Sequence, residues 1–198
     1  MRTWLESIGY GLKVGVILLP VVMMIYAAGS MLVNKKSNYL RCVINGLFAL
    51  YMSCVFALVF LPLPSLADGN LPTQFKGQVI PFLSVYNVYL DPSVEGVCQI
   101  LFNIVMTVPF GVYFAYYFGT DVKKVAKYTF ALSLMIEVAQ LTGLFFIFNG
   151  SYRLFDVDDL MCNTLGGVIG AVAVAKCTFL PVIAKYDVVF AKLSHRNA

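Results

Sequence analysis

Apolar residues gather in five long stretches that are separated by shorter polar segments. Each stretch is about twenty residues long, which is the length that an α-helix needs to cross the hydrocarbon core of a bilayer. The pattern therefore predicts an all-α fold, a polytopic membrane helix bundle made of a single integral membrane domain, residues 1–198. We expect its spans near residues 12–32, 41–61, 97–118, 125–148 and 160–180.

The segment between the second and third stretches has a different pattern. It contains several prolines, namely Pro62, Pro64, Pro72, Pro81 and Pro92. A proline inside a helix removes a backbone hydrogen bond, so a long regular helix is not expected here. Residues 79–90 are nevertheless apolar and aromatic. They are too few to cross the bilayer, and we expect them to be re-entrant or to lie at the membrane interface.

The composition also indicates a membrane protein. Hydrophobic residues make up 60% of the chain and charged residues 12%, whereas a soluble domain has about 25% charged residues. The net charge of +4 does not indicate a nucleic-acid partner, because the basic residues lie in short clusters at the ends of the spans. Basic segments at 33–41, at 119–127 and after 176 alternate with acidic segments at 62–96 and 149–159. The positive-inside rule then predicts a cytoplasmic C-terminus and an extracytoplasmic loop 149–159.

The fourth stretch carries a carboxylate where lipid would otherwise be expected. Glu137 lies near its middle, and Gln140 follows on the same helical face. A charge at the bilayer centre costs about 2.5–3.5 kcal/mol on insertion scales, so we expect Glu137 to face protein or water and to have a partner. With the predicted topology, polar residues from separate segments fall at one depth: Asn103, Glu137, Gln140, Arg153, Asp156, Asp159 and Asn163.

This polar set has two interpretations. It either lines a functional cavity or forms an ion-paired cluster that only stabilises the fold. Both interpretations predict a pair between Arg153 and a carboxylate, so that pair alone does not separate them.

Small residues continue the polar pattern along two of the spans. Gly166 and Gly170 share a face of the fifth span with Asp159 and Asn163. Glycine stripes let membrane helices approach closely, and we assign helix packing to Pro109, Gly111, Gly166 and Gly170.

The cysteines and the histidine show no metal-binding spacing. All five cysteines lie in or beside apolar spans, and the single His195 lies in the polar tail. We therefore expect no metal and no cofactor. Cys98 and Cys162 fall near the same membrane face, and the sequence leaves open whether they form a disulfide.

Taken in order, these residues form three spaced motifs. They read Asn103-x5-Pro109-x-Gly111, then Ser133-x3-Glu137-x2-Gln140, then Arg153-x2-Asp156-x2-Asp159-x3-Asn163-x2-Gly166-x3-Gly170. The ordered set resembles the VanZ-like family of bacterial membrane proteins over roughly residues 75–175, and Val79-Ile-Pro-Phe82 is similar to the family's NLVPF-type element. That family is associated with reduced susceptibility to teicoplanin-type lipoglycopeptides. The resemblance implies a role in the bacterial cell envelope.

Three functions fit the sequence. The first is the binding or remodelling of an envelope lipid, a lipid-linked cell-wall intermediate or a lipoglycopeptide in an outward-facing polar cavity, where Arg153 suits an anionic group. The second is an intramembrane enzyme that acts on a lipid headgroup, with Glu137 as general base and Arg153 stabilising an oxyanion. The third is a small proton-coupled lipid transporter that uses Glu137 as a relay. Membrane lipid is the expected partner in all three.

Overall fold

The structure is a computed structural model that describes residues 13, 39–60, 77–148, 150–151 and 153–177. The chain divides into two compact units, residues 1–65 and 66–198. In the first unit, helix α2 spans Tyr39–Phe60 and coincides with the second expected span, 41–61. Apart from Lys13, the first expected span, 12–32, lies outside the described residues.

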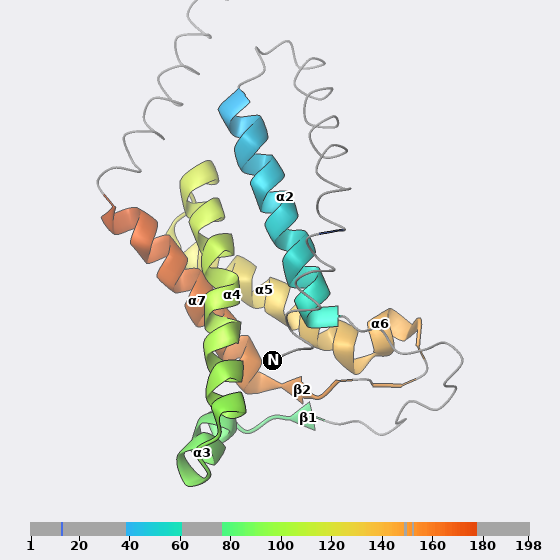
Figure 1. The fold of residues 1–198 in the computed structure, drawn as a ribbon. Coiled ribbons are helices and arrows are strands. Elements are labelled where there is room, and N and C mark those ends of the chain that lie inside the picture. Colours follow the sequence, from blue (N-terminus) through green and yellow to red (C-terminus); the bar gives the residue numbers. More distant parts are fainter. Residues whose placement is uncertain (1–12, 14–38, 61–76, 149, 152, 178–198) are drawn as a thin grey trace, which may run out of the picture. The chain divides into compact units, whose positions relative to one another are not determined.

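The second unit is a small helical bundle with one short strand pair (Figure 1). Helix α7 packs against both α4 and α5, and most extensively against α4. In chain order its elements are β1 (Gly77–Gln78), α3 (Leu83–Leu90), α4 (Val94–Phe118), α5 (Val122–Leu141), α6 (Gly143–Phe146), β2 (Phe155–Asp156) and α7 (Val157–Lys176). The all-α prediction holds, because the strands contribute only two residues each.

Glycines allow α4 and α7 to touch backbone to backbone. A Cβ atom at Gly111 would overlap the carbonyl of Gly167, and one at Gly166 would overlap the carbonyl of Ile104. Gly170 meets the carbonyl of Val108 in the same way. Pro109 lies inside α4 beside this contact. The contact fixes the two helices close together, as small-residue stripes do in membranes.

Helix α5 is shorter than the fourth expected span. It ends at Leu141, whereas the apolar pattern predicts a helix to residue 148. Gly143 has φ 60°, and Leu144, Phe145 and Phe146 also have positive φ values, so the chain makes a left-handed turn. Glycine after the last helical residue is a common way to end a helix. The position of Glu137 changes with this boundary: it lies one turn from the end of α5 and not near its middle.

The aromatic segment before α4 forms a helix too short to cross a bilayer. It forms the short helix α3, in which no residue is buried. Its large apolar side chains Val85, Tyr86, Tyr89 and Leu90 are exposed, as is Phe82 just before the helix. The short helix fits the expected length, and an interfacial or re-entrant position remains a prediction.

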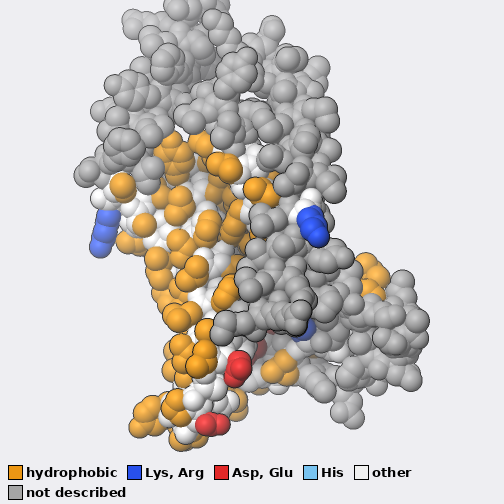
Figure 2. All heavy atoms as spheres, in the orientation of Figure 1, with side chains coloured by type: hydrophobic (Ala, Val, Ile, Leu, Met, Phe, Trp, Pro, Cys, Tyr) orange, Lys and Arg blue, Asp and Glu red, His pale blue; other side chains and the backbone are white. Residues whose placement is uncertain are grey.

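Two of the described helices, α4 and α7, are long and apolar enough to cross a bilayer by length and composition. Their bounds match the third and fifth expected spans to within about four residues. The arrangement of five spans remains a prediction. Figure 2 shows hydrophobic side chains over much of the described face and acidic side chains near the end that carries α3.

Candidate functional site

Asp158 holds the N-terminus of α3, although the two are far apart in the sequence. Its Oδ2 accepts a hydrogen bond from the backbone N–H of Ser84 at 2.7 Å, and its Oδ1 accepts one from the backbone N–H of Phe82. The first N–H groups of a helix have no partner within the helix, and a side chain near the N-cap usually satisfies them. Phe82 occupies the N-cap with φ 65° and gives no side-chain cap. Asp158, which is buried, supplies that cap from α7.

Asp156 extends this connection to the strand pair. Its Oδ2 accepts from the Ser84 hydroxyl at 3.1 Å, and its Oδ1 accepts from the Gln78 side-chain amide at 3.2 Å. The same Oδ1 accepts from the backbone N–H of Asp158 at 2.8 Å, which caps α7. Strand β1 pairs with β2 in parallel, and Gln78 lies opposite Asp156. Segments 77–84 and 155–158 are thus joined by both backbone and side-chain bonds.

Burial changes the acidity of Asp156, which lies outside the helices. Removal from water raises the pKa of its carboxyl above the ordinary value, because a charged carboxylate loses hydration. Hydrogen bonds from the N–H of Asp158 and the hydroxyl of Ser84 act in the opposite direction and favour the charged form. Desolvation is the larger effect.

Glu137 supports the same loop from α5. Only 2% of its surface is exposed, and its Oε2 accepts from the backbone N–H of Asp156 at 3.0 Å. Asp156 is therefore fixed from both sides, by Glu137 through its backbone and by Gln78 and Ser84 through its side chain. Glu137 therefore faces protein, as the sequence predicts, and its partner is a backbone N–H.

A second group of polar contacts ties the three long helices together. The Asn103 side-chain amide donates to Asp159 Oδ1, which joins α4 to α7. The Asn163 side-chain amide donates to Ser133 Oγ at 2.8 Å, which joins α7 to α5. Thr107 Oγ1 donates to the carbonyl of Asn163 at 2.6 Å. Within the described part of the chain, Asn163 Oδ1 is a buried side-chain atom without a hydrogen-bond partner.

Gln140 and Arg153 complete the predicted set. Gln140 is buried on the same face of α5 as Glu137, while Arg153 is exposed in the loop before β2. The positive charge of Arg153 interacts electrostatically with the carboxyls of Glu137 and Asp159. A direct ion pair of Arg153 with Glu137, Asp156 or Asp159 remains a prediction.

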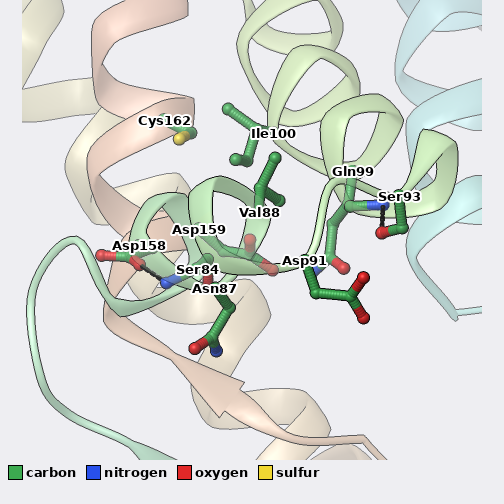
Figure 3. A pocket seen from close by; sticks show the side chains of 11 residues that line it. Ser84, Asn87, Val88, Asp91, Ser93, Gln99, Ile100, Asp158, Asp159 and Cys162 are labelled. Atoms are coloured by element: carbon green, nitrogen blue, oxygen red, sulfur yellow. Dashed lines mark hydrogen bonds between the residues drawn. The ribbon is translucent and has the colours of Figure 1, made fainter.

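A pocket of about 290 Å³ lies between α3, the first turns of α4 and the first turns of α7. Figure 3 shows the apolar side chains of Val88, Ile100 and Cys162 on one side of it and polar side chains on the other. The lining residues are Ser84, Asn87, Val88, Asp91, Ser93, Gly96, Gln99, Ile100, Asp158, Asp159 and Cys162. The hydrogen bonds of Asp158 to α3 form one wall of the pocket.

Cys98 and Cys162, for which the sequence leaves a disulfide open, are not bonded to each other in the structure, and Cys162 lines the pocket. Among the described residues, no group of three or more His, Cys, Asp or Glu side chains is placed to hold a metal ion.

Comparison with known proteins shows the family of the chain. The profile of the VanZ/LLP1 family matches residues 48–180, which include the pocket and the polar contacts behind it. The chain belongs to the VanZ/LLP1 family. No curated protein and no solved structure gave a significant match. Family membership together with the two long apolar helices identifies a membrane protein.

In this VanZ/LLP1 protein, the predicted polar residues separate into two layers. Asp159 lines the pocket, and Asn103 is bonded to it. Glu137, Asp156 and Asn163 lie outside the pocket lining, in the buried contacts that position α3, β2 and α7. The predicted residues thus lie in neighbouring layers and do not all face one cavity.

Of the residues that line the pocket, the predicted functional set contains only Asp159. Ser84, Asn87, Asp91 and Gln99 come from α3, its C-cap and α4, and Asp158 comes from α7. A signal was present, because Ser84, Asn87 and Asp91 recur at helical spacing within an otherwise apolar segment. The VanZ/LLP1 match begins well before this segment, at residue 48.

Proposed function

We propose that this protein binds the polar headgroup of an envelope lipid or lipid-linked cell-wall intermediate in the pocket between α3, α4 and α7. The observation that carries the proposal is the two-sided pocket, which has apolar side chains on one side and hydrogen-bonding groups on the other. An amphiphile bound at a membrane surface needs apolar contacts for its chains and hydrogen-bonding groups for its headgroup. By this binding the protein would lower susceptibility to teicoplanin-type lipoglycopeptides.

The surroundings of the pocket support a lipid over a soluble ligand. The exposed apolar residues of α3 continue onto α4, where Val94, Val97, Leu101 and Val105 lie on one exposed stripe. A helix with this character suits the boundary between headgroups and acyl chains. A lipid could therefore keep its chains against α3 and α4 while its headgroup enters the pocket.

The size of the pocket limits what it can enclose. Drug-sized ligands occupy pockets of about 300–1,000 Å³, and this one lies at the lower limit. A headgroup or a single sugar fits that volume, but a whole lipoglycopeptide does not. We therefore place the antibiotic effect downstream of lipid binding, with at most one substituent of the drug entering the pocket.

Charge supports an outward orientation of the pocket. Lys123, Lys124 and Lys127 lie at the junction of α4 and α5, and Lys176 ends α7, while the pocket lies at the opposite ends of α4 and α7. The positive-inside rule puts such lysines in the cytoplasm. A cysteine introduced at the exposed Arg153 should then react with an impermeant maleimide in intact cells, and a reaction seen only after lysis would invert the topology.

The contacts of Glu137 favour binding over catalysis at this site. Glu137 does not line the pocket, and its Oε2 is occupied by the N–H of Asp156. A general base must lie within hydrogen-bond reach of the proton that it removes. The transporter alternative has no better support, since Gly167 packs directly on Thr129 along the buried polar face of α5.

Blocking the pocket tests the proposal. Cys162→Phe should fill the apolar side of the pocket, reduce co-purified lipid in native mass spectra by about tenfold, or roughly 1.4 kcal/mol, and raise lipoglycopeptide susceptibility. Cys177→Phe is the matched control, because Cys177 is exposed at the far end of α7. Equal lipid adducts in a folded Cys162→Phe protein would overturn the proposal.

A further inference from the structure

The charged side chains that line the pocket have one sign. Three acidic side chains line it, those of Asp91, Asp158 and Asp159, and none of the described lining residues is Lys, Arg or His. The oxygens of Asp158 are already engaged by the N-terminus of α3. Asp159 is also engaged, by Asn103 at Oδ1 and by the Gln99 side chain, so of the three carboxylates the exposed Asp91 is the one most open to a ligand, with Asp159 beside it. A wholly anionic headgroup would be repelled here, and a cationic group would be attracted.

The neutral lining residues can accept hydrogen bonds from a ligand. Asn87, Gln99, Ser84 and Ser93 offer carbonyl and hydroxyl oxygens as acceptors beside the carboxylates. A primary ammonium group carries three N–H donors, which suits such a surface. A quaternary ammonium has no N–H, and proteins usually bind it in a cage of aromatic rings. None of the residues that line this pocket is aromatic.

We propose that the pocket selects a membrane lipid whose headgroup ends in a primary ammonium, bound by Asp159 and Asp91 with help from Gln99 and Asn87. This inference rests on the proposed function and names its ligand class. The occupant is a lipid and not a free amine, because the exposed apolar stripe of Val94, Val97 and Leu101 adjoins the pocket and can hold acyl chains. The ammonium enters the polar side, and the phosphate stays at the mouth, away from the carboxylates.

A competition among lipids tests this selection. The full chain is placed in nanodiscs that contain equal amounts of phosphatidylethanolamine, phosphatidylcholine and phosphatidylglycerol, and the lipids retained on the protein are counted by native mass spectrometry. Phosphatidylethanolamine should be retained at least about fivefold over each of the other two, a free-energy difference of roughly 1 kcal/mol. Preference for phosphatidylglycerol, or equal retention of all three, would overturn the inference.

Two substitutions test whether Asp159 and Asp91 cause the preference for phosphatidylethanolamine. Asp159→Asn and Asp91→Asn should each reduce the preference for phosphatidylethanolamine, and Asp91, which is exposed, can be changed with little risk to the fold. Asp121→Asn removes the same charge at the exposed N-cap of α5 and should leave the preference unchanged. A preference that survives both pocket substitutions would contradict the inference.

The two proposals fail in different ways. If a lipid is retained and Cys162→Phe displaces it, but the retained lipid is anionic, the pocket binds headgroups and only the amine selectivity is wrong. If Cys162→Phe displaces no lipid of any class, the proposed function is wrong as well.

Discussion

The carboxylate of Asp158 caps helix α3 through the backbone N–H of Ser84, which lies 74 positions earlier in the chain. The interaction makes the position of α3 depend on the first turn of α7. Because α3 forms one side of the pocket, the geometry of the pocket depends on this one buried side chain. Asp158 is thus a positioning residue whose two oxygens are directed at the helix and not at the ligand.

Removing this cap should destabilise the protein and empty the pocket. Asp158→Ala leaves the part-buried N–H groups of Phe82 and Ser84 without their charged acceptor, and a hydrogen bond to a charged group contributes about 1.5–3 kcal/mol. We expect a lower melting temperature in detergent and weaker lipid retention. Asp121→Ala removes an exposed cap from α5 and should have a smaller effect on melting and none on retention. A normal melting temperature for Asp158→Ala would show that α3 is not held in this way.

Helix packing should not tolerate a methyl group at Gly170. Its Cβ would overlap the carbonyl of Val108, so Gly170→Ala should separate α7 from α4 and cost about 1–3 kcal/mol. Ala173→Val also enlarges a small residue of α7, but on an exposed part of the helix, and should change stability by less than about 0.5 kcal/mol. Thermal unfolding of the two variants in the same detergent is the measurement. Similar melting of both would argue against close α4–α7 contact.

Glu137→Gln should separate the charge of this residue from its structural role. The amide oxygen can still accept from the N–H of Asp156, so we expect the variant to express and melt like the parent. We also expect it to weaken the effect on lipoglycopeptide susceptibility, because a neutral acceptor holds the N–H of Asp156 less firmly than a carboxylate, and Asp156 in turn positions Ser84 at the pocket. Full activity in the folded variant would exclude an ionic role for Glu137. Parallel loss of melting temperature and activity would indicate a purely structural one.

The raised pKa of Asp156 predicts a pH-dependent stability difference. A carboxyl whose folded-state pKa lies above its unfolded value favours folding when it is protonated, and this stabilisation is lost as the pH rises through the folded pKa. Asp156→Asn does not titrate. The melting temperature of the variant minus that of the parent should therefore increase as the pH rises above about 4, the ordinary pKa of an aspartate. A difference in melting temperature that stays constant as the pH rises from there would contradict the raised pKa of Asp156.

The sequence predicts the helices of this protein better than it predicts their ends and connections. The apolar patterns that predict spans at 97–118 and 160–180 correspond to α4 and α7, because span length and glycine spacing are local properties. The predicted end of the fourth span, residue 148, is wrong for α5, which ends at Leu141. The apolar pattern gives no sign of this end, because apolar residues continue through a left-handed turn from Gly143 to Phe146. Thr142-Gly143 was the local signal for that end.

Only part of the candidate site could be predicted, because some of its contacts join residues far apart in the sequence. Polar residues in apolar spans, such as Asn103 and Asn163, stand out in a sequence, and both make interhelical contacts. The pairing of Gln78 with Asp156 and the cap that Asp158 gives to α3 join residues more than seventy positions apart. No local pattern encodes such contacts, and the pocket that they create could not be derived from the spacing of Asp158 and Asp159 alone.

The accessibility of the Cys162 thiol tests most directly whether a lipid occupies the pocket. A variant that keeps only Cys162, and a second that keeps only Cys177, are reacted with a maleimide in delipidated detergent and again after phosphatidylethanolamine is added. Occupancy predicts that the lipid slows alkylation of Cys162 at least about fivefold, or roughly 1 kcal/mol of protection, while Cys177 at the far end of α7 reacts at an unchanged rate. Equal alkylation rates for Cys162 with and without lipid would contradict binding in this pocket.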